Sequence, residues 1–224
     1  LRSQTSAFSL LTRNASLDSQ HAAIKDLRGN QMPFEIRTDD IAFTKVNLPY
    51  GWLGNMSPHP VWFNGRRWRT TEALFQALRF TCDDLREQIR NEPSPMGAKM
   101  VAKRLKNENA ERSEIFSHKP MDTTDMENMR MVLKLKIAQH PELLSKLLNT
   151  QNKRIIEDVT SRAGPRHEFW GARKDGELWV GHNHLGVMWM ELRGQLADWK
   201  NDHDADQVMP PFLQNFTRES QPGP

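Results

Sequence analysis

The dipeptide Asn64-Gly65 is the feature of this sequence that most constrains how the chain folds. It lies between two triplets, Val61-Trp62-Phe63 and Arg66-Arg67-Trp68, each of which suits a short strand. Both central positions of a type I′ turn need positive φ, and Asn-Gly is the pair that tolerates this best. The sequence therefore predicts a two-stranded antiparallel hairpin at this point.

A helix is expected directly after the hairpin, capped by Thr70 or Thr71 and running to Phe80. It carries Glu72 and Gln76 one turn apart. A carboxylate and an amide at this spacing can hold a water and a sugar hydroxyl together. The alternative is a solvated helix face, which the spacing alone favours.

The rest of the chain predicts mainly helices joined by short strands. Turn, cap and periodicity signals place helices at 83–91, 95–106, from the capping box 124–127 onward, from Pro141, and at 187–199. Short strands are expected at 34–36, 41–43, 155–159 and 177–180, and a loop at 163–167. We therefore predict an α+β fold that is predominantly α-helical, with small antiparallel β elements.

The domain organisation follows from length and polarity. A chain of 224 residues suits one compact domain, which we place at 34–200. Polar composition predicts a disordered extension at 1–33 and a disordered tail at 201–224. No apolar run approaches the roughly 20 residues of a membrane span, so no membrane association is expected.

Composition also limits the chemistry. The net charge of +3 permits a phosphate-bearing ligand or nucleic acid without proving either. The single cysteine, Cys82, excludes an internal disulfide and a cysteine-based zinc site, and it favours a cytoplasmic location. No P-loop, dinucleotide-binding, HExxH or GxSxG motif is present. His182 and His184 form an HxH pair without an evident third ligand, so neither a metal nor another cofactor is expected.

Seven segments, in this order, resemble the NADAR (YbiA-like) family. They are FTKVNLPYGWLGNMSPHPV, TTEALFQALRF, SPMGAKMVAKR, MRMVLKLKIAQHPELLSKLLNT, IIED, FWG and NHLGVMWMELR, and together they extend over 43–196. The resemblance implies an α-rich fold and an N-glycosidase, a hydrolase that cleaves the bond between ribose and a base or amine nitrogen. For relatives it implies two substrate classes. One is the phosphoribosylamino-pyrimidine intermediates of riboflavin synthesis, and the other is ADP-ribose attached to guanine in nucleic acid.

The resemblance also implies roles for particular residues. Glu72 is the expected catalytic acid, and Lys45 in FTK matches the lysine that members acting on ADP-ribose use. This lysine favours removal of ADP-ribose from guanine, with riboflavin intermediates as the alternative substrate. The residues expected to contact or border the substrate are Phe43, Tyr50, Gly51, Asn55, Gln76, Trp170, Gly171, Asn183, Leu185 and Gly186.

Several questions stay open at this level. Lys45 is either an ordinary exposed lysine or, if buried among aromatics with a lowered pKa, a base or imine-forming nucleophile. His184 stands where the family usually places arginine, which leaves substrate choice less certain than the chemistry. The expected partner is a nucleotide or ADP-ribosyl small molecule, or ADP-ribosylated nucleic acid. A module that binds ADP-ribose or a nucleotide without cleaving it is the non-catalytic alternative, and the oligomeric state is undetermined.

Overall fold

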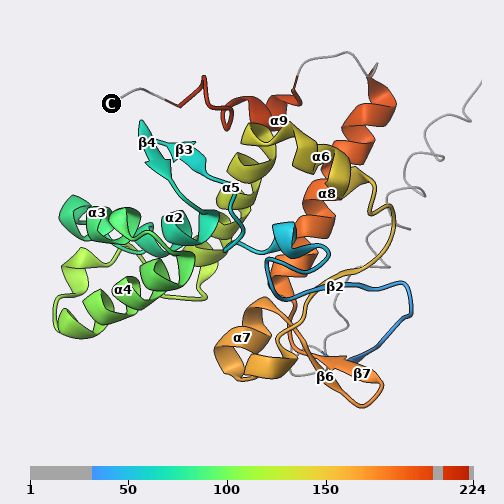
Figure 1. Cartoon of the computed structure of the whole chain (residues 1–224), viewed down its shortest axis with the longest axis horizontal. Coiled ribbons are helices and arrows are strands. Elements are labelled where there is room, and N and C mark those ends of the chain that lie inside the picture. Colours follow the sequence, from blue (N-terminus) through green and yellow to red (C-terminus); the bar gives the residue numbers. More distant parts are fainter. Residues whose placement is uncertain (1–31, 204–208, 222–224) are drawn as a thin grey trace, which may run out of the picture.

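The computed structural model describes residues 32–203 and 209–221 of the chain (Figure 1). The helices are α2 (Thr71–Ala77), α3 (Asp83–Asn91), α4 (Pro95–Glu108), α5 (Thr123–Gln139), α6 (Pro141–Leu148), α7 (Pro165–Trp170), α8 (His184–Asp202) and α9 (Pro211–Gln214). The strands are β1 (Phe34–Glu35), β2 (Ile41–Phe43), β3 (Val61–Phe63), β4 (Arg66–Trp68), β5 (Ile155–Glu157), β6 (Arg173–Asp175) and β7 (Leu178–Val180). Three 3-10 turns are η1 (Gly51–Leu53), η2 (Ser113–Ile115) and η3 (Thr160–Arg162).

The two longest helices, α5 and α8, pack together at the centre of the molecule. In Figure 1, α2, α3 and α4 form a group on one side of α5, while α7 and the β6–β7 hairpin lie near one end of α8. The core consists of the faces that these helices turn inward, including Val132, Leu133 and Leu135 of α5 and Met188 and Trp189 of α8. The prediction of an α-rich α+β fold is confirmed.

The strands form three small sheets, of which one differs from the prediction. β3 pairs with β4, and β1, β7 and β6 form a second sheet, all antiparallel as expected. β2 and β5, however, pair in parallel, with Phe43 opposite Glu157. Parallel strands need a long crossover connection. Here that connection contains α2 to α6, so no local sequence signal could reveal the pairing.

Local signals placed several elements correctly. The hairpin is confirmed, with φ of 47° at Asn64 and 71° at Gly65. The Thr70 hydroxyl caps α2 by accepting from the Ala73 N–H, and Ser94 caps α4 in the same way. These side chains satisfy N–H groups that have no partner within the helix.

Other boundaries were predicted wrongly. The cap of α5 is Asp122 rather than the Thr124 capping box, because the Asp122 carboxylate accepts from the Asp125 N–H. The expected loop at 163–167 overlaps α7, whose first residue is Pro165. α8 begins at His184, before the expected 187, because Asn183 takes a left-handed conformation and turns the chain into the helix.

Helix α2 ends at Ala77 rather than Phe80, and Phe80 instead forms a bridge with Phe116. The segment after α8, where disorder is expected, contains α9, which packs on α5 and buries Leu213. Of the expected extension at 1–33, only 32 and 33 lie within the described residues. Within the described ranges, no helix combines the length and apolar character that crossing a membrane requires.

Two glycines allow the chain to pack closely on β5. A Cβ at Gly186 of α8 would lie 2.1 Å from the Ile155 carbonyl oxygen, and one at Gly171 would lie 2.4 Å from that of Glu157. Both neighbours are backbone atoms of a paired strand, so they cannot move aside cheaply. Glycine at these positions therefore sets how closely α8 and the end of α7 approach β5.

We expect Gly186→Ala to lower the free energy of unfolding by roughly 1–3 kcal/mol, because the added methyl forces α8 away from β5. Gly194→Ala, on the same helix, is the matched control, since nothing lies within 4 Å of its Cβ position. There alanine stabilises the helix by up to about 1 kcal/mol. Urea denaturation measures both, and equal stability of the two variants would refute this account of Gly186.

Candidate active site

A chain of hydrogen bonds runs along one face of α2 and holds Glu72 in place. Gln76 Nε2 donates to Glu72 Oε1 over 2.9 Å, and Arg79 Nη1 donates to Gln76 Oε1 over 2.8 Å. Glu72 and Gln76 are each only 8% exposed. The solvated-face alternative for this pair is therefore wrong, since a buried carboxylate needs fixed partners of this kind.

This series of hydrogen bonds ends at Asp125 of α5. Arg79 pairs with Asp125 through two parallel bonds of 2.8 Å, and the aspartate is fully buried. Asp125 also accepts from the Met121 N–H and contacts His118 Nε2. Burial alone raises the pKa of Asp125, but the hydrogen bonds and charge of Arg79, with help from Met121 and His118, bring it below its usual value. The ionised form of Asp125 is therefore favoured, and its two hydrogen bonds fix the orientation of the Arg79 guanidinium.

The other side of Glu72 rests on Asn55. The Asn55 carbonyl oxygen accepts from the Glu72 N–H over 3.0 Å and from the Thr71 hydroxyl over 3.2 Å. The Asn55 side chain is also engaged within the protein, with Oδ1 accepting from Thr71 and Nδ2 donating to the sulfur of Met129. In this structure Asn55 supports the first turn of α2.

A second carboxylate, Glu157, lies close enough to Glu72 to sense its charge. Burial raises the pKa of Glu157, the Arg162 guanidinium opposes that rise, and the negative charge of Glu72 adds to it. Glu157 Oε1 accepts from Arg162 Nη2 over 2.7 Å, and the side chain is 16% exposed. A carboxyl group whose pKa lies above its ordinary value keeps its proton to a higher pH than a free carboxyl group does, so Glu157 is suited to act as an acid.

Three residues expected to border the substrate fix the backbone of β5 around Glu157. Asn183 Oδ1 accepts from the Glu157 N–H, and its Nδ2 donates to the Ile155 carbonyl, so this side chain imitates a neighbouring strand. Gly171 and Gly186 allow their segments to approach the same strand. Asn183 is itself buried at 2% exposure. Their arrangement holds Glu157 in position.

Trp170 connects this side of the site to α2. Its ring packs edge-on against Phe75 at 5.6 Å between centroids, and Phe75 lies on α2 between Glu72 and Gln76. The Arg79 guanidinium lies over the Phe75 ring, 4.5 Å from its centroid. Trp170 is only partly buried, so part of its surface remains available to a flat ligand.

Cationic groups lie near Glu157 on two elements. Lys99 of α4 and Arg162 of η3 both favour its ionised form. Burial lowers the pKa of His167 on α7, and the positive charges of Lys99, Arg162 and Arg166 lower it further. These groups give the site a positive rim of the kind that attracts phosphate.

The remaining predicted site residues lie at the end of β2, in the segment that follows it and in the first turn of α8. Lys45 is exposed in the turn that follows β2, so the burial required for an imine-forming lysine is absent here. Lys45 lies two residues after Phe43, and Phe43 pairs with Glu157. Lys45 and Glu157 therefore lie at the same edge of the parallel pair, where both strands end. Tyr50 is 39% exposed, whereas Phe43, Gly51 and Leu185 are buried.

The His182 and His184 rings stack at 5.3 Å between centroids. Among the residues that the structure describes, no group of three histidine, cysteine or acidic side chains is arranged to hold a metal ion.

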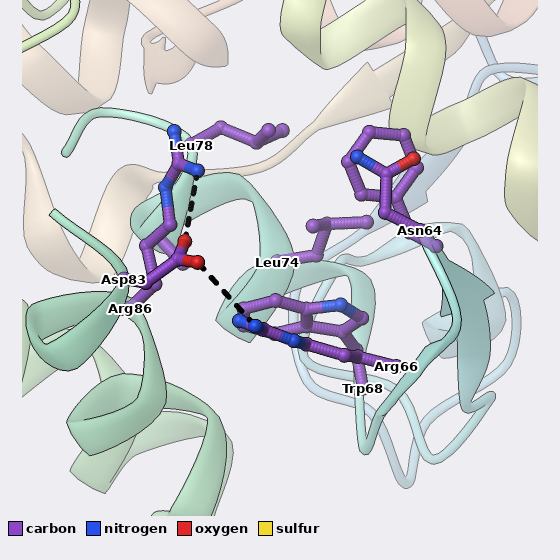
Figure 2. A pocket seen from close by; sticks show the side chains of 9 residues that line it. Asn64, Arg66, Trp68, Leu74, Leu78, Asp83 and Arg86 are labelled. Atoms are coloured by element: carbon purple, nitrogen blue, oxygen red, sulfur yellow. Dashed lines mark hydrogen bonds and ion pairs between the residues drawn. The ribbon is translucent and has the colours of Figure 1, made fainter. Parts of the chain in front are cut away.

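A cleft of roughly 250 Å³ opens on the opposite face of α2 (Figure 2). Leu74, Ala77 and Leu78 line its α2 side. Arg66 and Arg86 each lie 3.4 Å from Asp83 at its edge. Because Glu72 and Gln76 point to the other face of the helix, this cleft is separate from the carboxylate site.

Glu157 is the site residue that the sequence did not single out. It lies in the segment IIED, which is part of the family resemblance and of a predicted strand, but no role was assigned to its acid. The available signal was an acid placed directly after two β-branched residues, at the end of a strand buried on both faces. Its partner Arg162 gave no sign, because only the tertiary fold brings η3 to β5.

The comparisons with known proteins agree with this fold. The model of the NADAR domain matches residues 42–197. N-glycosidase YbiA of Escherichia coli is 32% identical over 171 residues, which cover 76% of this chain and 97% of that protein. The NMR structure of E. coli YbiA superposes with a TM-score of 0.60 at 31% identity, covering 78% of this chain and 95% of that one.

The riboflavin biosynthesis protein PYRR of Zea mays is 28% identical over 175 residues, which cover 73% of this chain but 26% of that protein. With these relatives, the predicted enzyme class, a hydrolase acting on N-glycosyl bonds, is confirmed. The chain belongs to the NADAR family.

We expect Asp125→Asn to lower the free energy of unfolding by roughly 3–5 kcal/mol, because it leaves the partly buried Arg79 without its counter-charge. Asp198→Asn, on the exposed side of α8, is the matched control and should change stability by less than about 0.5 kcal/mol. Chemical denaturation followed by circular dichroism measures both changes. A loss in Asp125→Asn no larger than in the control would contradict the anchoring role of this ion pair.

Proposed function

We propose that the chain hydrolyses the bond between ribose and a base nitrogen in an anionic substrate, and that this substrate is ADP-ribose attached to guanine. The observation that carries the proposal is the pair of carboxyl groups Glu72 and Glu157, which are held by different elements, with the pKa of Glu157 raised by burial and by the charge of Glu72. Enzymes that cleave glycosidic bonds commonly divide acid and base roles between two such groups.

The chemistry requires one bond to break and one to form. As the bond between C1′ and the base nitrogen breaks, its electron pair leaves with the base and positive charge develops on the sugar. The Glu72 carboxylate stabilises that charge and takes a proton from the water whose oxygen bonds to C1′. Glu157 gives its proton to the departing nitrogen. The products are free base and the hydrolysed ribosyl group, with no net change in protons.

The surroundings of the pair suit a nucleotide-like substrate. Lys99 and Arg162 offer positive charge for phosphate groups, and the partly buried Trp170 offers part of its ring surface for the leaving base. Bringing a phosphate near Lys99 and Arg162 would also draw those cations away from Glu157. Substrate binding would then favour the protonated form of the acid just before it is needed.

Lys45 supports the ADP-ribose assignment through its match to the lysine in the FTK motif. In the proposed roles it lies at the carboxyl edge shared with Glu157 and contacts the substrate ribose. A covalent variant has Lys45 attack C1′ and water then release the sugar, which needs the bound substrate to exclude solvent from the amine.

Riboflavin intermediates are the second candidate substrate class. The specific observation in their favour is the match to the maize protein, whose name places it in riboflavin biosynthesis. Both classes share a phosphorylated ribose joined to a nitrogen, so the same carboxylate pair serves either. The leaving base, which differs in size, distinguishes them at Trp170.

A substrate panel tests the assignment directly. Wild-type protein is incubated with ADP-ribosylated guanosine and with phosphoribosylamino-pyrimidine intermediates, and released base is followed by chromatography. We expect guanine release, and we expect Glu72→Gln and Lys45→Ala to lower kcat by about 100-fold or more without changing the melting temperature. Glu111→Gln and Lys146→Ala, both at exposed positions, are the matched controls.

Faster turnover of the riboflavin intermediates would replace the ADP-ribose assignment with the second candidate. Binding of ADP-ribosylated guanosine without any product would favour a non-catalytic reader. Wild-type rates in both Glu72→Gln and Lys45→Ala on every N-riboside would overturn the proposed roles.

The pH dependence tests Glu157 separately. Its pKa is raised in the folded protein, so the acid form persists above the ordinary carboxyl range and kcat/KM should fall as pH rises through that raised value. The same shift means that ionising Glu157 destabilises the fold as pH rises. Glu157→Gln should lose most activity together with this alkaline decline, while Glu191→Gln keeps both. An unchanged profile in Glu157→Gln would rule it out as the acid.

A further inference from the structure

Lys136 is a lysine buried completely inside the protein, at 0% exposure on α5. Its neighbours along the helix, Leu135 and Ile137, are equally buried core residues. Within the described residues no carboxylate forms an ion pair with it. An unpaired buried ammonium is costly, so its retention in the centre of the core calls for a specific role.

The three N–H groups of this ammonium meet three acceptors from one short segment, 52–57. Nζ donates to the Trp52 carbonyl, to the Gly54 carbonyl over 2.9 Å and to the Ser57 hydroxyl over 2.7 Å. It also lies 5.9 Å from the centre of the Trp189 ring. The number of donors matches the number of acceptors, as only the charged form of lysine allows.

The same segment carries the support of Glu72. Asn55 lies within it, and the Asn55 carbonyl accepts the N–H of Glu72. Trp189 Nε1 adds a fourth tie by donating to the Leu53 carbonyl over 2.9 Å. Lys136 and Trp189 thus bind the carbonyls of 52–54 from inside the core, and the next residue holds the first turn of α2 from the outside.

We propose that Lys136 is a positioning residue for the active site: its buried ammonium fixes the segment 52–57 on which Asn55, and through it the Glu72 carboxylate, is held. The inference concerns the geometry of Glu72 and rests on the proposed function only for its effect on activity. Loss of the ammonium removes one hydrogen-bond donor from each of three oxygens in this segment and leaves only the segment's own contacts, such as Ser57 N–H to the Gly54 carbonyl, so the segment shifts and the Asn55–Glu72 bond loosens.

Burial lowers the pKa of Lys136 to about 7. A neutral amine has two N–H groups and a lone pair, and the lone pair would face one of the three oxygens. Burial, followed by the positive charge of the neighbouring Lys136, lowers the pKa of His59 to about 4. The charged form donates to all three oxygens at once, and burial opposes that charge.

Amide hydrogen exchange measured by NMR tests the positioning role without reference to activity. In Lys136→Met, exchange of the Glu72 N–H should accelerate at least tenfold relative to amides in the core of α6 and α8. Lys134→Met removes a partly exposed lysine from the same helix and is the matched control, with no change expected at Glu72. Ser57→Ala, which removes one of the three acceptors, should give an intermediate acceleration and keeps the test available if Lys136→Met does not fold.

In steady-state kinetics we expect Lys136→Met and Ser57→Ala to lower kcat while KM changes little, because the substrate contacts stay in place. In Lys136→Ala, added propylammonium should restore part of kcat, whereas 1-propanol should not. Unchanged Glu72 exchange in Ser57→Ala together with uniform acceleration over all amides in Lys136→Met would overturn the inference. Loosened Glu72 exchange with undiminished kcat would instead refute the catalytic role of Glu72 and leave the positioning role intact.

Discussion

The candidate site depends on the buried ion pair between Arg79 and Asp125. It joins α2 to α5 through two parallel hydrogen bonds, and it orients Gln76, which in turn orients Glu72. A bidentate pair of this kind fixes direction as well as distance, because the planar guanidinium has little rotational freedom once both bonds form. α2 spans only Thr71 to Ala77, and a helix this short cannot hold an acid in place unaided. The rigidity of Glu72 is therefore supplied by α5, through Arg79 on one side and through Lys136 and the segment 52–57 on the other.

The two faces of α2 are used for different purposes. One face carries Glu72, Phe75 and Gln76 toward Trp170 and the carboxylate site. The other carries Leu74, Ala77 and Leu78 to the cleft beneath the β3–β4 hairpin. The hairpin contributes the apolar cover, and Thr70, two residues after the end of β4, caps α2, so formation of the hairpin sets where α2 starts. The Asn64-Gly65 turn thus influences the site indirectly, by fixing the first turn of the helix that carries the acid.

Local chemistry accounts for the parts of the structure that were predicted correctly. The hairpin, the caps at Thr70 and Ser94 and the faces of the long helices depend on residues within one or two turns of one another. The parallel pairing of β2 with β5, the position of Glu157 beside Glu72 and the burial of Gln76 depend on contacts between distant segments, which a single sequence does not display. The resemblance to a family supplied Glu72 and Trp170, but the support roles of Asn55 and Asn183 became visible only when their hydrogen bonds were known.

The parallel pairing of β2 and β5 has a consequence for how the molecule matures. Glu72 lies within the crossover that the two strands enclose, and Glu157 lies in the strand that closes it. A chain emerging during synthesis can therefore form the hairpin and α2 to α6 while the second carboxylate is still missing. In the proposed mechanism, bond cleavage needs β5 to be paired with β2, because this pairing brings Glu157 to the site that Glu72 occupies. Under that mechanism, activity requires the non-local pairing of β2 with β5 and therefore reports on the native topology as a whole.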